Sequence, residues 1–331
     1  MSTVPKAILY HSPESVWSAV VLLTLEEKGY ASDEVDLKVV DLGRGENLDP
    51  AFLRINPKAT VPTLVVPLEK TLSQEVESRY KAITSTKDIV EFLDRSRSTR
   101  SRTHTTSTAP APSLTPATIS FSAKSNLVID TLLHGDAGDP NRLTMFSIRD
   151  EDSLKKLAST YGSKVVGRQE ALGKYLQKAE SGELVVSEKV KTLWREKKAG
   201  TDILVDVYAK ADIPITDLPV EDQVKRQKYL QGSSDMWQVG LKEVLTQLEK
   251  EIIGPYVLGD QVSLADLHLA GWLGRVLWVV QARAEDDGKT AVNKLRKAAG
   301  LEELGECKLA AFWDAVKERA SWKKVYGAGL Y

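Results

Sequence analysis

The segment from Ile55 to Leu64 constrains the fold more than any other part of the chain, because it places Pro62 at the start of an apolar run. X-Pro bonds are nearly the only peptide bonds with an accessible cis form, and proline is tolerated at the first position of a strand. A cis bond before Pro62 turns the backbone of Val61 outward, where its N–H and C=O can pair with a short peptide as an added strand does. An ordinary proline turn before the run Val61 to Val66 is the alternative. The segment therefore predicts a peptide-binding strand edge or a simple turn.

Composition limits the classes of partner. The chain has 331 residues, enough for about two domains, and 42% hydrophobic with 27% charged residues is ordinary for a globular protein. Its net charge of −1 gives no general attraction for nucleic acid, which is therefore not expected as a partner. The single Cys307 excludes an internal disulfide and a zinc site built on cysteine pairs. The histidines lack metal-ligand spacing, so no metal is expected.

The sequence also predicts location. Its amino terminus lacks the pattern of a secretory signal, so a cytoplasmic protein is expected. The most apolar late segment, Leu264 to Val280, contains Asp266, His268 and Arg275. Such a composition favours a buried helix over a membrane span, and no membrane partner is expected.

A Ser/Thr/Pro/Ala-rich segment from residue 95 to 120 divides the chain. Its composition cannot bury enough apolar surface to offset the entropy of ordering it, which predicts a mobile linker or a surface loop. The expected domains are therefore residues 1–95 and 121–331, joined by a linker at 96–120.

The first part alternates strand and helix patterns. Strands are expected at residues 7–10, 35–40, from Pro62 and at 80–83, and helices at 16–28, 50–53 and 86–94. Residues 67–79 exceed the length of a hairpin turn and predict a surface excursion. The order βαβ followed by ββα is the thioredoxin-like arrangement.

The second part has almost only helical patterns. Helices are expected at residues 151–161, 168–180, 187–198, 220–250, 263–282 and 309–320. Ser263 can cap one of them while the side chain of Asp266 accepts a hydrogen bond from the backbone at the helix start, a variant of the capping box. This pair is interpreted as a folding element, with no catalytic role.

Four segments, in this order, carry a family resemblance. They are Ser12-Pro13-Glu14-Ser15, Asn56 to Pro62, Ser85 to Ile89, and Leu258 to Asp266, and together they resemble the cytosolic glutathione transferases. The resemblance covers about residues 5–95 well and 220–280 moderately. Residues 96–219 have no counterpart in compact members and are most similar to enlarged fungal transferase-like proteins. The fold implied is an α/β thioredoxin-like N-terminal domain followed by an all-α C-terminal domain, with a large insertion.

The resemblance implies a hydroxyl at the start of the first helix, close to the sulfur of bound glutathione. A thiol of pKa near 8.5 needs about 2.7 kcal/mol of preference for its thiolate to lower that pKa by about two units. One hydroxyl hydrogen bond and the dipole of the helix can supply about that much. Ser15 is the chosen donor, Tyr10 is the rival at the end of the first strand, and Ser12 is a third option. For Ser15 the structural alternative is a first-turn residue behind an N-cap at Ser12.

The rest of the implied glutathione site matches in part. Val61 and Pro62 are expected to bind the peptide backbone, and Ser85 and Thr86 to bind the γ-glutamyl group at a helix start. In the family this pair is an acidic residue followed by serine, so the acidic partner for the ammonium is missing here, where Ser85 takes its place. Asn47 stands in the region that binds the glycyl carboxylate and can still donate a hydrogen bond.

Two classes of function are expected from these features. The first is a glutathione transferase that joins the thiolate of its co-substrate to a small hydrophobic electrophile. The alternative is a non-catalytic protein of the same fold that binds glutathione or a hydrophobic ligand, or acts as a scaffold. A thiol reductase is disfavoured because no cysteine lies near Ser15. The resemblance also implies a homodimer as a possible assembly.

Overall fold

The computed structural model of the chain describes residues 6–67, 80–98, 106–305 and 307–331. Contacts group it into two compact units that interleave along the sequence. Unit 1 takes the described residues of 1–38, 62–145 and 235–331, and unit 2 takes 39–61 and 146–234. The domain boundaries near residues 95 and 120 remain a prediction.

A four-stranded sheet confirms the thioredoxin-like expectation. Its strands are β1 (Ala7–His11), β2 (Val35–Val39), β3 (Thr63–Pro67) and β4 (Tyr80–Ile83), in the spatial order β2-β1-β3-β4. β3 runs antiparallel to both neighbours, with Thr63 opposite Tyr10 of β1 and Leu64 opposite Ile83 of β4. This register brings the end of β1, the start of β3 and the end of β4 to one edge of the sheet.

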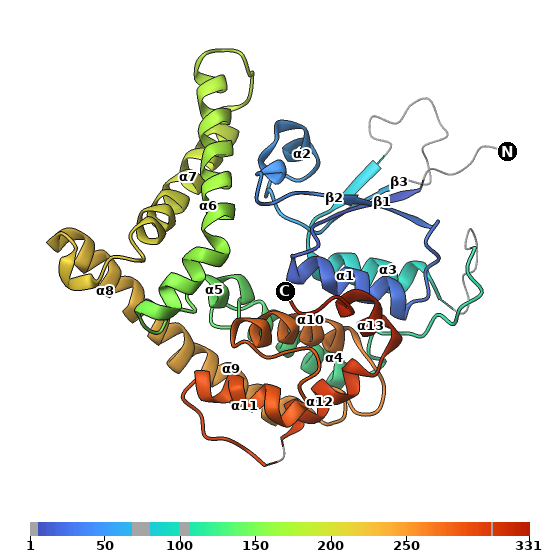
Figure 1. Cartoon of the computed structure of the whole chain (residues 1–331). Helices are drawn as coiled ribbons and strands as arrows, with labels where there is room; N and C mark the ends of the chain where they lie inside the picture. The colour runs from blue at the N-terminus through green and yellow to red at the C-terminus, as the bar shows by residue number, and fades with distance from the viewer. Residues whose placement is uncertain (1–5, 68–79, 99–105, 306) are drawn as a thin grey trace, which may run out of the picture. The chain divides into compact units, whose positions relative to one another are not determined.

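Two helices of unit 1 lie against one face of this sheet, α1 (Val16–Glu27) and α3 (Thr86–Ser96) (Figure 1). α1 is apolar on nearly every side because α10 (Leu264–Val279) packs against it as well. A Cβ on Gly271 of α10 would lie 2.6 Å from a methyl group of Val20, so the glycine permits this close approach. α1 is therefore a central element of the core of unit 1.

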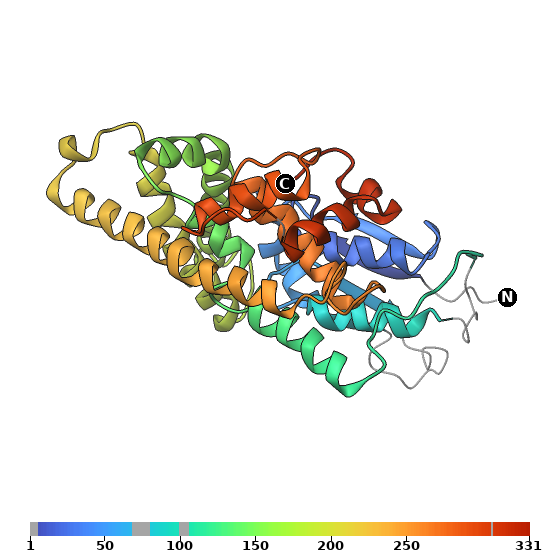
Figure 2. The same ribbon diagram turned by 90° about the horizontal axis from the view of Figure 1, so that it is seen from below.

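Further helices complete unit 1, among them the C-terminal ones that Figure 2 shows in orange to red. They are α4 (Ile119–Asn126), which continues as the π-helix η3 (Leu127–Leu133), α5 (Pro140–Met145), the π-helix η5 (Met236–Leu241), α9 (Lys242–Glu251), α11 (Gly288–Ala298), α12 (Lys308–Lys317) and α13 (Ala320–Tyr326).

The predicted cap of α10 at Ser263 is confirmed, since the buried Asp266 accepts hydrogen bonds from the backbone N–H of Ser263 at 2.7 Å and from its hydroxyl at 2.6 Å. Burial raises the pKa of Asp266 to about 6, although these hydrogen bonds oppose the shift.

Unit 2 consists of a helical pair with shorter elements around it. These are η1 (Glu46–Leu48), α2 (Pro50–Ile55), α6 (Glu151–Glu180), α7 (Glu188–Ala209), η4 (Ile215–Asp217) and α8 (Val220–Asp235), which ends where unit 1 resumes. The buried side chains of Leu48, Leu172 and Trp194 share one core, and the indole N–H of Trp194 donates to the carbonyl of Leu48 at 3.1 Å.

Two helix predictions were wrong. The helices expected at 151–161 and 168–180 form the single helix α6, which runs through both Gly162 and Gly167. A Cβ on Gly167 would lie 2.6 Å from the carbonyl oxygen of Gly43, whereas one on Gly162 would meet nothing within 4 Å. Gly167 therefore serves close packing and does not end the helix. The helix expected at 220–250 is confirmed as the consecutive elements α8, η5 and α9, of which the middle one is π-helical.

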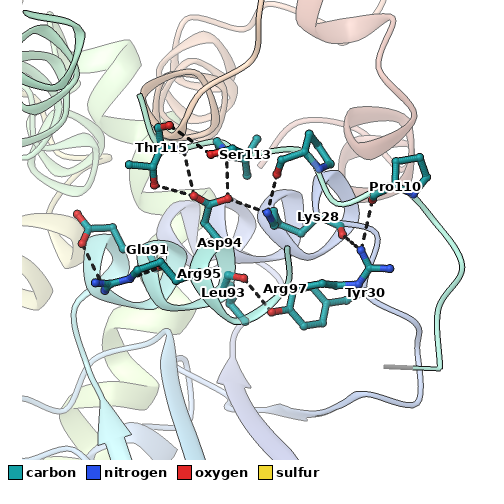
Figure 3. Close-up of polar contacts among 12 residues, drawn as sticks. Lys28, Tyr30, Glu91, Leu93, Asp94, Arg95, Arg97, Pro110, Ser113 and Thr115 are labelled. Carbon is teal, nitrogen blue, oxygen red and sulfur yellow. Dashed lines mark hydrogen bonds and ion pairs between the residues drawn. The ribbon is translucent and has the colours of Figure 1, made fainter. Parts of the chain in front are cut away.

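Residues 106–118 contain no regular element and are fastened to unit 1 by buried polar groups (Figure 3). Asp94 accepts from the backbone N–H groups of Leu114 and Thr115, each at 3.0 Å. Arg97 donates to the carbonyls of Ala109 and Pro110, at 2.9 and 3.3 Å. Residues 99–105 of the predicted linker and most of the predicted excursion at 67–79 lie outside the described residues. No helix of the described parts is long and apolar enough to cross a membrane.

Candidate functional site

The turn between β1 and α1 presents Ser15 at a helix start. The backbone N–H of Ser15 donates to the carbonyl of Ser12 at 3.0 Å, which closes the turn around Pro13. Ser15 is then the N-cap of α1, and its Oγ accepts from the backbone N–H of Ser18 at 3.2 Å. The expectation that Ser12 caps the helix was wrong, because Ser12 is buried and its own N–H donates to Oγ of Ser18 at 3.3 Å.

Arg275 of α10 holds the same turn from the other side. Its guanidinium donates to the carbonyl oxygen of Glu14 and, at 3.0 Å, to that of Tyr331. Arg275 is 5% exposed, so these hydrogen bonds form away from bulk water. The residue before Ser15 is thus tied to a buried helix.

The hydroxyl of Ser15, at the N-terminus of α1, can donate a hydrogen bond to an anion. The oxygen of Ser15 accepts from the helix, and its hydrogen can still be donated, because a serine hydroxyl does both. The positive end of the dipole of α1 favours a negative charge beside it. Ser15 is partly exposed as a residue. The arrangement suits stabilisation of a thiolate.

Tyr10 lies at the end of β1 in the same region. It is partly buried and opposite Thr63, and the ammonium of Lys38 lies 5.6 Å from the centre of its ring. Its position next to the turn keeps Tyr10 as an alternative donor to Ser15.

Ser85 and Thr86 stand at the start of α3, as expected. Ser85 is the N-cap, whose Oγ accepts from the N–H of Asp88 at 3.4 Å, and Thr86 is buried. Leu64 lies opposite Ile83 in the antiparallel pair β3 and β4. Pro62, two residues before Leu64, and Ser85, two residues after Ile83, therefore lie at the same end of the sheet. Tyr10, Ser12, Pro62 and Ser85 are thus gathered at one end of the sheet, where α1 and α3 begin.

The cis form, one of the two possibilities for the bond before Pro62, is not present. Among the described residues the one cis peptide bond precedes Pro255, so the Val61–Pro62 bond is trans, the form that X-Pro bonds favour by about 0.5–1 kcal/mol. No described residue forms a hydrogen bond with the backbone of Val61. Its N–H and C=O therefore keep the capacity to pair with a peptide.

Asn47 has a structural bond within unit 2. Its side chain is buried, and its amide donates to the carbonyl of Ala59 at 2.7 Å. This bond joins the two ends of the segment that contains α2. A direct contact of Asn47 with glutathione stays a prediction.

A cluster of three rings, which the sequence did not predict as a unit, lies beside the first turn of α1. Trp17 stacks on His134 with ring centres 3.8 Å apart and planes 15° from parallel. Nε2 of His134 lies 3.1 Å from Nδ1 of His268 on α10. The two histidines are 134 positions apart in sequence, so no spacing rule could join them. His134 lies within residues 96–219, for which the resemblance offers no counterpart in compact members, so the family motifs gave no signal for it.

Burial lowers the pKa of both histidines. For His268, which is fully buried, the shift carries the pKa well below its usual range, and His134 adds to it. For His134 burial is again the main cause, with Asp130 and Asp139 acting in the opposite direction. Both imidazoles are therefore neutral at pH 7. The described residues contain no group of three side chains that could hold a metal ion.

A cavity lined by α3 is not formed by the predicted site residues. It has a volume of about 490 Å³ and is lined by Lys87, Glu91, Asp94, Thr115 and Ser125, among others. None of the predicted site residues lines it. Its charged groups already pair with neighbours, as Lys87 does with Asp130 at 2.5 Å. We therefore place the candidate site at the start of α1.

A thioredoxin-like sheet followed by a large helical region, with a serine at the start of α1, defines the class as the glutathione transferase fold. The family model described as the N-terminal domain of glutathione S-transferase matches residues 9–101. Glutathione S-transferase TCHQD of Arabidopsis thaliana is 30% identical over 319 residues, which cover 96% of this chain and 89% of that protein. The chain belongs to the glutathione S-transferase family, a family of enzymes.

Two further similarities are more limited. A tetrachloro-p-hydroquinone reductive dehalogenase of Sphingobium chlorophenolicum is 43% identical over 63 residues, 19% of this chain and 24% of that protein. The crystal structure of glutathione transferase F7 from Populus trichocarpa is 15% identical, with a TM-score of 0.49 over 96% of this chain and 97% of that one. The serine type and the similarity to fungal proteins stay predictions.

Proposed function

We propose that the protein is a serine-type glutathione transferase in which Ser15 stabilises the thiolate of bound glutathione. The observation that carries the proposal is the partly exposed Ser15, whose hydroxyl caps the N-terminus of α1, a helix of 12 residues. A hydrogen bond to a charged group contributes about 1.5–3 kcal/mol and a helix dipole about 0.3–1 kcal/mol. Together they reach the roughly 2.7 kcal/mol that a thiol pKa lowered by about two units requires.

The reaction proposed is conjugation to a small hydrophobic electrophile. The thiol proton leaves to water, the sulfur attacks an electrophilic carbon, and the S–C bond forms as the leaving group departs with its electron pair. The backbone of Val61 beside Pro62 is proposed to pair with the peptide, and Ser85 and Thr86 to bind its γ-glutamyl carboxylate. Tyr10 is the alternative thiol donor.

A reductive reaction is less well supported, although one relative is named a reductive dehalogenase. Chemistry through a mixed disulfide needs a cysteine at the site. The single cysteine of the chain, Cys307, stands at the start of α12. Burial also raises the pKa of its thiol, which makes it a poorer nucleophile.

The experiment compares Ser15→Ala with Ser187→Ala. Ser187 caps α7 through the same kind of bond, so both variants lose a helix cap while only the first loses the proposed donor. Glutathione binding is measured by calorimetry and conjugation by turnover of benzyl chloride. We expect Ser15→Ala to lose about 100-fold in kcat/KM and Ser187→Ala to match the natural protein. Full activity in Ser15→Ala contradicts the assignment and makes Tyr10→Phe the next variant.

A cysteine at position 15 tests proximity without relying on turnover. The Ser15→Cys protein, treated with oxidised glutathione, should form a mixed disulfide that mass spectrometry detects, because the thiolate can attack a disulfide held beside it. The natural protein, which contains Cys307 alone, is the control. Absence of the adduct despite measurable glutathione binding contradicts a thiol site at Ser15.

Non-catalytic binding is the second candidate function. It is favoured by the serine at position 85, where the resemblance implies an acidic partner for the glutathione ammonium. Glutathione binding without conjugation of any electrophile supports it. Loss of all glutathione binding supports a ligand-binding or scaffold protein, and sedimentation tests the proposed homodimer.

A further inference from the structure

The Trp17, His134 and His268 cluster is built from three separate elements. Trp17 is the second residue of α1, His134 ends the π-helix η3, and His268 lies within α10. π-helical turns are rare and often occur at functional sites. Because Trp17 follows Ser15 by two positions, the ring stacked on it lies beside the start of α1.

The stack and the hydrogen bond fix His134 while leaving it accessible. One ring face is covered by Trp17, and Nε2 is engaged by His268. The residue is nevertheless exposed, and its Nδ1 forms no hydrogen bond with any described residue. A rigid imidazole with one nitrogen left for a ligand is the result.

The buried histidine determines which nitrogen of His134 carries the proton. Nε2 of His268 is buried and has no hydrogen-bond partner among the described residues. A buried N–H without an acceptor is rarer than a buried acceptor without a donor, so this Nε2 holds the lone pair. Nδ1–H of His268 then donates to Nε2 of His134. A neutral His134 consequently carries its own hydrogen on Nδ1.

We propose that His134 is a second catalytic residue, which donates a hydrogen bond from Nδ1 to the oxygen of a planar, conjugated carbonyl electrophile. This inference rests on the proposed transferase function and names the class of its second substrate. An imidazole held in place at an exposed residue, with one N–H left to donate, suits a flat ligand with one acceptor atom. His268 is a positioning residue, since it fixes the tautomer and orientation of His134.

The chemistry of addition explains why such a donor is useful. The thiolate sulfur attacks the β-carbon, the S–C bond forms, and the π electrons of the C=C bond move toward the carbonyl. Negative charge develops on the carbonyl oxygen, where a fixed N–H stabilises it. Water then supplies a proton to the α-carbon and the C=O bond is restored. No other co-reactant is needed.

The test compares two electrophiles that share a phenyl ring. Benzylideneacetone has a conjugated carbonyl, and benzyl chloride has no oxygen. For His134→Phe, which keeps a ring against Trp17, we expect kcat/KM for benzylideneacetone to fall about 100-fold and that for benzyl chloride to fall far less. His134→Gln, which retains an N–H donor, should recover part of the loss. An equal fall for both electrophiles, or for neither, overturns the inference.

Nitrogen NMR of the imidazoles decides the inference separately from turnover. In the natural protein His134, identified by the signals missing from His134→Phe, should carry its proton on Nδ1. Addition of acetophenone, a planar ketone that does not react, should shift that resonance. A proton on Nε2, or no shift at saturating ketone, overturns the inference. If neither electrophile is conjugated by the natural protein, the proposed function fails, and the NMR result still decides the role of His134.

Discussion

Two polar pairs in unit 1 join distant parts of the chain, and they differ in how completely their hydrogen-bonding groups are paired. Lys28 and Asp94 form an ion pair with 2.8 Å between Nζ and Oδ1, and both side chains are at most 5% exposed. Asp94 also accepts from the N–H and hydroxyl of Thr115, at 3.0 and 2.6 Å, and from the N–H of Leu114 at 3.0 Å (Figure 3). Both carboxylate oxygens thus have donors.

The pair His134 and His268 leaves capacity unused. Its single hydrogen bond joins one nitrogen of each ring, the second nitrogen of His268 is buried without a described partner, and the second nitrogen of His134 is left for a ligand. Buried polar groups that are fully hydrogen-bonded stabilise a fold and specify its arrangement. A buried polar group without a partner lowers the stability of the fold, and a catalytic role is one explanation for its presence. The difference fits a structural role for the first pair and supports the catalytic role proposed for His134 in the second.

The largest expected effect belongs to the ion pair. Lys28→Met leaves the carboxylate of Asp94 buried without its cation, and breaking a buried pair in this way costs about 3–5 kcal/mol. Urea unfolding measures the loss. Replacing both residues, in Lys28→Met with Asp94→Leu, should recover part of it because no charge is then left unpaired. A loss below about 1 kcal/mol in the single variant contradicts a structural role for the pair.

Acid should reveal the same pair. Burial by itself raises the pKa of Asp94, but the hydrogen bonds from Lys28 and Thr115 outweigh it and hold that pKa below its usual range. A lowered folded-state pKa gives stability that is present above about pH 4, the pKa in the unfolded chain, and is lost as pH falls further. The free energy of unfolding should therefore decline more below about pH 4 in the natural protein than in Asp94→Asn.

Asp266 provides a control of opposite sign. Its folded pKa of about 6 lies above its ordinary value of 3.8, so between these values the folded chain keeps a proton that the unfolded chain has lost. Its contribution to stability therefore falls as pH rises from about 4 to 6. Asp266→Asn should remove that decline and leave the acid dependence below about pH 4 in place. Parallel pH profiles for the two variants contradict the assignment of these carboxylates.

Features of the fold that depend on residues close together in sequence could be predicted, whereas features that depend on tertiary contacts could not. Strands β1 and β4 and helices α1 and α3 were predicted within a few residues, because periodicity and caps such as Ser85 are local. The continuous helix α6 was missed because the gap between the two predicted helices contains Gly162 and Gly167. Whether such a glycine ends a helix or admits another backbone is decided by tertiary packing.

The candidate site also contains some features that local sequence predicts and others that depend on tertiary packing. Ser15 and the start of α1 were found from a short motif and a helix pattern. The trans bond at Pro62 is the form that X-Pro bonds favour, but by only about 0.5–1 kcal/mol, so the sequence alone left both forms open. The pairing of His134 with His268 depends on how η3 and α10 pack, and neither segment carries a local sign of the other.

Loss of the Ser15 cap should have a smaller effect on stability than loss of the ion pair. Ser15→Ala removes the acceptor for the N–H of Ser18 and should cost about 1 kcal/mol in the free energy of unfolding. Ser187→Ala should cost a similar amount at α7. If Ser15→Ala and Ser187→Ala lose the same stability but only Ser15→Ala loses conjugation activity, the activity loss comes from the missing hydroxyl and not from the missing helix cap. A loss above about 3 kcal/mol in Ser15→Ala alone indicates that the turn itself collapses.

The smallest effect is expected at the second pair. His268→Leu removes one hydrogen bond, worth about 1 kcal/mol, but also removes a buried nitrogen that has no partner, whose burial costs about 1–3 kcal/mol. The two terms nearly cancel, so urea unfolding should change by less than about 1 kcal/mol. Leu273→Ala, in the same helix and equally buried, should cost about 2–5 kcal/mol as a packing control. A loss at His268 as large as that at Lys28 contradicts the distinction between the two pairs, because it means that both serve the fold.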